Sequence, residues 1–204
     1  MIALVDYKAG NLTSVRKALA AIGADVFTPA EPAELARAAG IIVPGVGHFG
    51  ATRALDRQWM DVVLDGVNHG TPLLGICLGM QWLFEGSEEA PDLPGLGLLP
   101  GTCVRLAGRT CSDATPVKVP HVGWNSLALR ARGWVNNDVP DGGQVYFTHS
   151  YVAPVTADTL AVTEHGEPFA AVVQRGRVAG VQFHPEKSGD LGLRILRNFA
   201  ELTR

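Results

Sequence analysis

The chain has 204 residues, of which 47% are hydrophobic and 18% are charged, and its formal net charge is -3. This size and composition are typical of a folded globular protein with one core, so we expect residues 1–204 to form a single domain. The small net charge gives no reason to expect binding to nucleic acid or to membrane surfaces. No apolar run is long enough for a transmembrane helix.

The first half of the chain alternates short apolar runs with helix-like segments. Continuous apolar runs are typical of strands buried on both faces, and the segments between them carry apolar residues at helical spacing. This alternation predicts an α/β protein of three layers, with a mostly parallel central sheet and helices on both faces. We expect strands at residues 2–5, 26–27, 41–43 and 73–76, and helices at 12–22, 32–39, 51–68 and 78–85.

The second half of the chain has a different character. Residues 87–101 are rich in Gly, Pro and acidic residues and are typical of a loop. The short β-like runs that follow have little helix between them, so we expect hairpins or antiparallel additions to the sheet rather than a second domain. A final helix begins near residue 190. The expected strands are residues 103–106, 117–119, 125–129, 145–148, 151–153, 160–163, 169–174 and 178–183.

The cysteines Cys77, Cys103 and Cys111 are odd in number, and none forms a C-x-x-C pair. Neither a disulfide framework nor a zinc site is indicated, and we expect no metal and no cofactor. Met1 is followed at once by an apolar run, without a basic segment or a cleavage site, so no secretory signal is expected. A reducing cytoplasm fits this pattern best, and the roles of Cys103 and Cys111 stay open.

The segment Gly75-Ile76-Cys77-Leu78-Gly79 joins an apolar strand to a helix with a cysteine at the apex. In a nucleophile elbow of the G-x-S-x-G type, glycines allow a sharp turn that exposes the apex side chain. A helix N-terminus also favours the thiolate form of a cysteine placed there. Cys77 is therefore a candidate nucleophile; the alternative is a buried structural cysteine, the commonest fate of a free thiol.

A cysteine nucleophile needs a base, and the best placed of the six histidines is His184. It follows an expected buried strand, Pro185 stiffens the next turn, and Glu186 supplies a carboxylate two residues after the imidazole. An imidazole can take the thiol proton and return it to the leaving group, while an acid fixes its tautomer. His184 and Glu186 supply both groups from one loop; the alternative interpretation is a simple surface turn.

Ligand sites in parallel sheets lie beyond the carboxyl ends of the strands. Three loops are expected there: residues 6–11, residues 44–47 and the turn at Cys77. The N–H of Leu78, directly after the nucleophile, can donate to a developing oxyanion, and the glycine-flanked loop 44–47 can supply further N–H groups. Without this context, loop 44–47 would be an ordinary turn.

Two motifs, Gly75-Ile76-Cys77-Leu78-Gly79-Met80-Gln81 and Phe183-His184-Pro185-Glu186-Lys187-Ser188, together resemble the class I (triad) glutamine amidotransferases, which have a flavodoxin-like fold. Further segments narrow the resemblance to the glutaminase subunits of imidazole glycerol phosphate synthase, in histidine biosynthesis. These segments are residues 6–15, 44–47, 120–125 and 146–151. The matched segments extend from residue 6 to residue 188, so the resemblance covers nearly the whole chain.

The resemblance implies a catalytic triad that hydrolyses glutamine. Cys77 would attack the side-chain amide and form a γ-glutamyl thioester. His184 would protonate the departing ammonia and then activate water, while Glu186 orients His184.

The resemblance also implies how the substrate is held. Glutamine would contact Gln81 and the segment His149-Ser150-Tyr151. The oxyanion hole would combine Leu78 with the loop at Val46 and Gly47, partly through reorientation of the peptide around Val46. Glycines on both sides of Val46 lower the cost of such a change.

In this family the ammonia passes to a partner, a cyclase with a (β/α)8 barrel that forms a heterodimer with the glutaminase. There it reacts with a ribulosyl nucleotide to give imidazole glycerol phosphate and an aminoimidazole carboxamide ribotide. We therefore expect glutamine and this cyclase as partners, with no nucleic acid and no membrane. Trp and Tyr are favoured interface anchors, although each alone would more often be a core residue. The implied interface residues are Asn11, Trp124, Tyr146 and Lys187.

Two alternatives share parts of this pattern. A glutaminase subunit of another synthase, of the anthranilate or aminodeoxychorismate type, has the same triad, but residues 44–47 and 120–125 argue against it. A flavodoxin-like binding or stress-response protein with a reactive cysteine would need no positioned His-x-Glu pair, which this chain has. Lys8 and Val122 stand where the family often has Gly and Met, which affects loop shape and interface detail rather than the triad.

Overall fold

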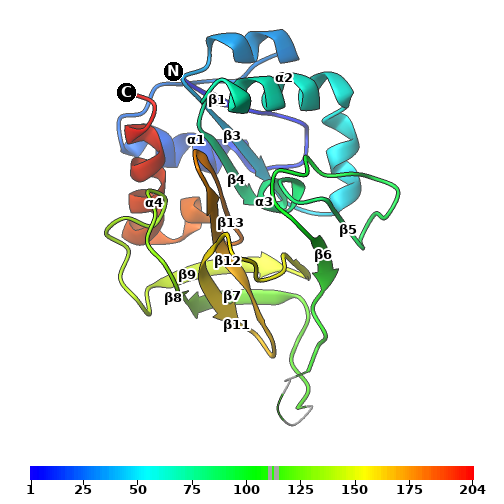
Figure 1. The fold of residues 1–204 in the computed structure, drawn as a ribbon. Coiled ribbons are helices and arrows are strands. Elements are labelled where there is room, and N and C mark those ends of the chain that lie inside the picture. The colour runs from blue at the N-terminus through cyan, green and yellow to red at the C-terminus, as the bar shows by residue number, and fades with distance from the viewer. Residues whose placement is uncertain (110–111, 113–114) are drawn as a thin grey trace.

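The computed structural model describes residues 1–109, 112 and 115–204, so Cys111 lies outside the described residues. Over these residues the largest sheet has eight strands (Figure 1). Their order is β2 (Val26–Phe27), β1 (Ile2–Leu4), β3 (Gly40–Gly45), β4 (Leu73–Cys77), β13 (Val178–Val181), β12 (Pro168–Arg175), β11 (Thr159–Glu164) and β8 (Ala128–Leu129). The strands from β2 to β13 run parallel, and the remaining strands pair antiparallel. The expected mostly parallel sheet with antiparallel additions is confirmed.

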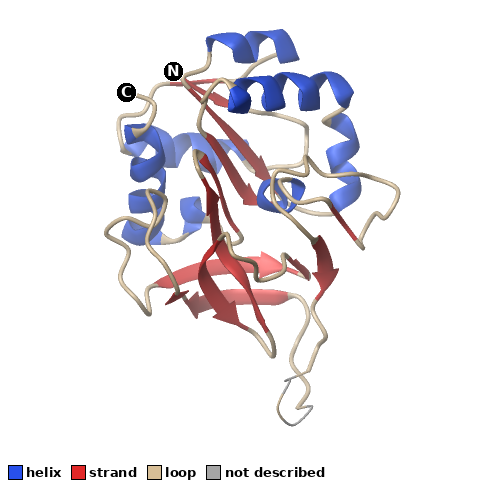
Figure 2. Ribbon diagram, viewed as in Figure 1, coloured by secondary structure: helices blue, strands red, loops and turns tan. Residues whose placement is uncertain are grey.

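Helices cover both faces of this sheet (Figure 2). Ile2 and Leu4 of β1 belong to one apolar core, and Ala3 between them belongs to the other. Because side chains alternate along a strand, each buried strand supplies both cores, which confirms the three-layer architecture. The first core includes side chains of α1 (Leu12–Ala21) and α4 (Gly189–Glu201), and the second includes those of η1 (Pro32–Arg37), η2 (Phe49–Ala54), α2 (Arg57–Asn68) and α3 (Leu78–Trp82).

Two small sheets complete the second half of the chain. One pairs β7 (His121–Ser126) antiparallel with β9 (Gln144–His149), and it lies across the lower part of the view in Figure 1. The other joins β10 (Tyr151–Val152), β6 (Thr102–Arg105) and β5 (Gly86–Ser87). A short 3-10 helix, η3 (Pro185–Lys187), follows β13 and leads into α4.

The helices differ from expectation in their extent. The helix expected at residues 51–68 is two helices, because the carboxylate of Asp56 accepts hydrogen bonds from backbone N–H groups and starts α2 anew. The segment expected at 32–39 is the 3-10 helix η1, and the helix expected at 78–85 ends at Trp82. Among the described residues, no helix combines the length and the apolar character needed to cross a membrane.

Two expected strands are corrected. Residues 117–119 are not a strand, because Pro116 and Pro120 remove backbone donors on either side. The strand expected at 125–129 is divided between β7 and β8, and the N–H of Leu127 between them donates to a loop carbonyl instead.

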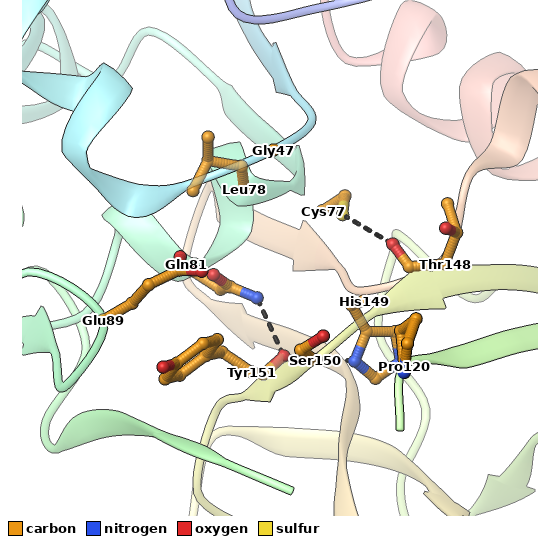
Figure 3. A pocket seen from close by; sticks show the side chains of 10 residues that line it. All are labelled: Gly47, Cys77, Leu78, Gln81, Glu89, Pro120, Thr148, His149, Ser150 and Tyr151. Atoms are coloured by element: carbon orange, nitrogen blue, oxygen red, sulfur yellow. Dashed lines mark hydrogen bonds between the residues drawn. The ribbon is translucent and has the colours of Figure 1, made fainter. Parts of the chain in front are cut away.

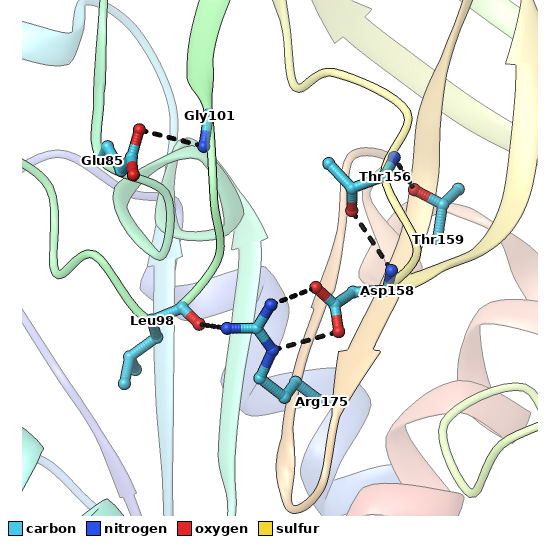
Figure 4. Close-up of polar contacts among 7 residues, drawn as sticks. All are labelled: Glu85, Leu98, Gly101, Thr156, Asp158, Thr159 and Arg175. Carbon is cyan, nitrogen blue, oxygen red and sulfur yellow. Dashed lines mark hydrogen bonds and ion pairs between the residues drawn. The ribbon is translucent and has the colours of Figure 1, made fainter.

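Arg175, at the end of β12, ties the loop after β5 to the antiparallel half of the sheet (Figure 4). Its guanidinium donates to the carbonyl oxygen of Leu98 at 2.8 Å and to both carboxylate oxygens of Asp158. The two ends of this loop are joined by a hydrogen bond from the N–H of Gly101 to the carboxylate of Glu85, at 3.1 Å. These contacts limit the freedom of the loop between them.

We expect Gly79→Ala to destabilise the fold strongly. A Cβ on Gly79 would overlap the backbone carbonyl oxygen of Val43 on β3, so α3 or β3 would have to move. The expected loss in free energy of unfolding is about 3 kcal/mol, measured by urea denaturation.

The matched control is Gly66→Ala in α2. There the nearest neighbours of a Cβ are Thr71 and Ile41, at ordinary contact distances of 3.6 and 3.7 Å. Helix propensity favours Ala over Gly by about 1 kcal/mol, so this variant should be as stable as the wild type or more stable. Equal urea midpoints for the two variants would contradict the packing described for α3.

Candidate active site

Cys77 stands at the apex of the predicted turn between strand and helix, which is confirmed, but its side chain is not exposed as expected: Cys77 is buried at 4% exposure. Strand β4 ends at Cys77 and α3 begins at the next residue. Cys77 itself has φ 53° and ψ -108°, in the half of backbone space that side chains other than glycine rarely occupy. A Cβ on Gly75 would lie 2.5 Å from the carbonyl oxygen of Gly79, and a Cβ on Gly79 would overlap β3. The two glycines therefore allow the strand and helix to approach closely enough to hold this turn.

His184 and Glu186 form a buried pair on the loop after β13. Nδ1 of His184 lies 2.8 Å from Oε1 of Glu186, and both side chains are only 2% exposed. Because β13 pairs with β4, this loop lies beside Cys77. Nε2 of His184 is buried and has no hydrogen-bond partner among the described residues. With Nδ1 held by the carboxylate, Nε2 is the nitrogen that can exchange a proton with the reacting groups.

The surroundings of His184 favour its charged form. Burial alone would lower the pKa of His184, but the neighbouring Cys77 sulfur and the Glu186 carboxylate outweigh burial and raise the pKa from 6.5 to about 10. An imidazolium that persists at neutral pH can protonate a poor leaving group. The pair is therefore suited to acyl transfer from an amide.

A cavity of about 310 Å³ opens in front of Cys77 (Figure 3). This volume suits a molecule the size of an amino acid. Its wall brings together most of the residues proposed for chemistry and binding, although Val46, His184 and Glu186 are not part of it. The lining residues are Gly47, Cys77, Leu78, Gln81, Glu89, Pro120, Thr148, His149, Ser150 and Tyr151.

The loop at Val46 is next to Cys77, because Gly45 pairs with Cys77 in the sheet. In this conformation the N–H of Val46 donates to the carbonyl oxygen of Ala9 at 2.7 Å, so it is not available to an oxyanion. Leu78 opens α3, where the first N–H groups have no partner inside the helix. Gly47 has φ 93°, a conformation that favours glycine.

The loop of residues 6–11 contains Ala9, whose carbonyl oxygen accepts the Val46 N–H. It also contains Lys8, whose backbone conformation is unusual for a residue other than glycine. Lys8 has φ 63°, a left-handed conformation in which glycine is common. Its backbone N–H and its ammonium group both donate to the carboxylate of Asp6, at 2.9 and 2.8 Å. The carboxylate thus supports a turn that the side chain of Lys8 disfavours, and the loop does not need glycine at this position.

The residues predicted to hold glutamine lie together through a shared acceptor, the carbonyl oxygen of Tyr151. Nε2 of Gln81 donates to it at 2.9 Å, and Nδ1 of His149 lies 3.1 Å from it. Nε2 of His149 lies 3.1 Å from Nδ1 of His121. Burial and His121 lower the pKa of His149 to about 3, so His149 is neutral. Its two ring nitrogens are engaged by the protein, and Ser150 lies between it and Tyr151 in the cavity wall.

Two functional candidates were missed from the sequence. Glu89 lines the cavity, and its Oε2 accepts the N–H of Phe49 at 2.6 Å. It is one of several acidic residues in an irregular loop, so no spacing marks it. Gln182, two residues before His184, is fully buried and donates from Nε2 to the sulfur of Cys77 at 3.6 Å. Gln182 directly precedes the motif Phe183-His184-Pro185-Glu186-Lys187-Ser188, and the sequence does not show where its amide points.

The residues predicted for a partner interface lie at the surface. Trp124 on β7 is 57% exposed, and its ring packs edge-on against Tyr146 of β9 at 6.1 Å between centroids. The ammonium group of Lys187 lies 5.7 Å from the Tyr146 ring centre. Asn11 is exposed and caps α1 by accepting the N–H of Ser14. Val122 is also largely exposed.

Comparison with known proteins gives one consistent family. Residues 3–202 match the family model of glutamine amidotransferase class-I. Three relatives are each named imidazole glycerol phosphate synthase subunit HisH. That of Halalkalibacterium halodurans is 45% identical and covers 99% of this chain and 96% of its own length. That of Gloeobacter violaceus is 49% identical, covering 98% and 88%. That of Thermococcus kodakarensis is 44% identical, covering 99% and 100%.

Solved structures agree with this fold. A crystal structure of a glutamine amidotransferase matches with a TM-score of 0.75 at 22% identity, covering 100% of this chain and 99% of that chain. PurLQS from Thermotoga maritima matches with a TM-score of 0.76 at 18% identity, covering 100% and 98%. At these identities the likeness shows the fold alone.

The raised pKa of His184 should make stability depend on pH. Its folded value of about 10 lies above the usual 6.5, so folding favours proton binding; the stabilisation is complete below pH 6.5 and is lost as pH rises to 10. Glu186→Gln removes the carboxylate that helps to hold this proton. We expect the difference in free energy of unfolding between wild type and this variant to narrow as pH rises from 6.5 to 10. Urea denaturation across that range measures it, and a constant or widening difference would contradict the assignment.

Proposed function

The chain belongs to the class I glutamine amidotransferase family, and we propose that it is the glutaminase subunit of imidazole glycerol phosphate synthase, which acts in histidine biosynthesis. The carrying observation is the buried His184–Glu186 pair beside the elbow cysteine Cys77, at the end of an amino-acid-sized cavity. Relatives of 44–49% identity that bear the HisH name favour this synthase over one of the anthranilate or aminodeoxychorismate type. The match over residues 3–202 supports the proposal that residues 1–204 form one glutamine amidotransferase domain.

The proposed reaction begins at Cys77. Its sulfur attacks the side-chain amide carbon of glutamine, and the N–H of Leu78 donates to the oxygen that becomes negative. Nε2 of His184 then gives a proton to the departing nitrogen, so ammonia leaves and a γ-glutamyl thioester remains. Water attacks the thioester, His184 takes its proton, and glutamate departs from the regenerated thiolate. Glu186 keeps His184 in the tautomer that these steps need.

Glutamine recognition is proposed to use the far side of the cavity. The carboxylate of Glu89 suits the α-ammonium group of the substrate, and its bond to the Phe49 N–H fixes its position. Gln81 donates from Nε2 to Tyr151 and to Gln182, so it presents its carbonyl oxygen to a substrate donor. We also include His149, Ser150 and Tyr151, of which His149 acts by holding the segment in place.

Activity is proposed to depend on a partner. The N–H of Val46, bonded to Ala9 in this conformation, must turn towards Cys77 to complete the oxyanion hole with Leu78 and Gly47. Ala9 belongs to the same loop as Asn11, so contact with a partner at Asn11 can be transmitted directly to Val46. The chain alone should therefore be a poor glutaminase.

The proposed partner is the cyclase subunit, a (β/α)8 barrel that receives the ammonia and makes imidazole glycerol phosphate and an aminoimidazole carboxamide ribotide. The exposed Trp124 packs against Tyr146, and aromatic side chains of this kind often carry much of the binding energy of an interface. The proposed interface also includes Lys187 and Asn11. A cytoplasmic location is proposed because the mechanism requires a reduced thiol at Cys77.

The proposal predicts that Cys77→Ser abolishes glutamine hydrolysis while leaving partner binding intact. The hydroxyl is a far weaker nucleophile next to this pair, and the substitution removes little volume. Ammonia release would be measured with and without the cyclase subunit and the nucleotide substrate, alongside binding by calorimetry. Hydrolysis by the variant at the wild-type rate would sink the assignment of the nucleophile.

Glu89→Gln should raise the KM for glutamine about tenfold or more, with a smaller effect on kcat. The substitution removes the negative charge that pairs with the substrate ammonium group, but the amide oxygen can still accept the Phe49 N–H. Glu88→Gln is the matched control, since Glu88 is exposed and outside the cavity wall. Steady-state kinetics of the complex measure both. Equal KM values for the two variants would exclude Glu89 from substrate binding.

A further inference from the structure

A continuous hydrogen-bonded chain leads from the cavity wall to the nucleophile through Gln182. Nε2 of Gln81 donates to the carbonyl oxygen of Tyr151 at 2.9 Å and to Oε1 of Gln182 at 3.2 Å. Nε2 of Gln182 then donates to the sulfur of Cys77 at 3.6 Å. Gln182 is 0% exposed, so its amide is shielded from bulk solvent and bonds within the protein.

The direction of this chain is set by its first member. A backbone carbonyl can only accept, so the group of Gln81 that faces Tyr151 must be the NH2 group. That group has a second hydrogen, which meets Gln182, and the group of Gln182 that faces it must therefore be its oxygen. The nitrogen of Gln182 is consequently the atom that faces the sulfur. The amide orientation follows from the donors and acceptors rather than from a choice between two similar atoms.

The backbone of Gln182 is fixed as well. Its N–H donates to the carbonyl oxygen of Ala171 on β12 at 2.9 Å. The backbone of Gln182 is therefore fixed by the sheet, and its side-chain amide is fixed between Gln81 and the sulfur of Cys77. A donor fixed in this way can meet a thiolate without reorganising.

Apart from Gln182, the described residues give the sulfur of Cys77 few polar neighbours. Its contact with Thr148 is 4.0 Å from a carbonyl oxygen, which can accept from a thiol but cannot stabilise a thiolate. His184 supplies positive charge, but its Nε2 has no partner in hydrogen-bonding geometry among the described residues. Gln182 is therefore a neutral donor to the sulfur, beside the positive charge that His184 supplies.

We propose that Gln182 is a positioning residue of the glutaminase reaction: its side-chain amide holds the Cys77 thiolate in place, and Gln81, through its own bond to Tyr151, sets the direction of that amide. The proposal rests on the function proposed for Cys77. It links the substrate-binding wall to the nucleophile, so that a displacement of the Tyr151 segment is transmitted to the sulfur. The same donor remains beside the sulfur when the thioester is hydrolysed and the thiolate leaves.

Gln182→Met tests this, since methionine has similar length and volume but no donor. Iodoacetamide alkylation of Cys77, followed by mass spectrometry, should slow about three- to tenfold, the effect of one hydrogen bond to a charged group less the gain in intrinsic nucleophilicity. In the complex, kcat should fall by about the same factor while KM stays within about threefold. The control is Gln174→Met on β12, where a glutamine amide bonds to Val135 but not to Cys77.

Alkylation at the wild-type rate in a folded Gln182→Met would overturn the proposal. This outcome is distinct from failure of the proposed function, which would appear as an absence of glutamine hydrolysis in the wild type. If Gln182→Met does not fold, NMR of the wild type replaces it: the side-chain amide signal of Gln182 should shift when Cys77 is alkylated, and that of Gln174 should not. An unchanged Gln182 signal would also overturn the proposal.

Discussion

The site depends on one packing constraint, the close approach of α3 to the strands β3 and β4. Gly75 and Gly79 leave no room for a side chain between these elements, and Cys77 consequently turns the chain through a left-handed φ of 53°. The parallel register of β3, β4 and β13 then places the neighbouring loops. Gly45 pairs with Cys77 on one side, and Val181 pairs with the strand residue Ile76 on the other. The loop of residues 44–47 and the loop that carries His184 therefore flank Cys77, because three adjacent strands end together.

In the proposed mechanism, this conformation has an incomplete oxyanion hole. The nucleophile, the His184–Glu186 pair and the cavity are in place, whereas the N–H of Val46 is bound by Ala9. A glutaminase that hydrolysed glutamine without its partner would release ammonia to solvent. An incomplete oxyanion hole in the free subunit would prevent this loss. The bond involves only one backbone N–H and one carbonyl, and its net worth is about 1 kcal/mol. A partner that contacts the loop of residues 6–11 can supply that much.

The sequence predicted the fold layers and the placement of Cys77, His184 and Glu186 at neighbouring strand ends, but not every residue of the candidate site. Cys77, His184 and Glu186 were predictable because each is in a short motif at a strand end, where spacing alone determines the neighbours. Glu89 was not, because its place depends on how an irregular loop folds back onto the cavity. The role of Gln182 depends on contacts with residues about a hundred positions away, such as Gln81. Apolar periodicity alone also missed two local effects. The cap at Asp56 divides the helix expected at 51–68, and the prolines Pro116 and Pro120 prevent a strand at 117–119.

The central claim is that Cys77 carries the glutamyl group during hydrolysis. The most direct measurement is mass spectrometry of the complex, quenched in acid while it turns over glutamine, with peptide mapping of the adduct. The account predicts an acyl group of glutamyl mass on the peptide that contains Cys77, present with substrate and absent without it. Rapid hydrolysis with no adduct on Cys77, or with the adduct on another residue, would contradict it.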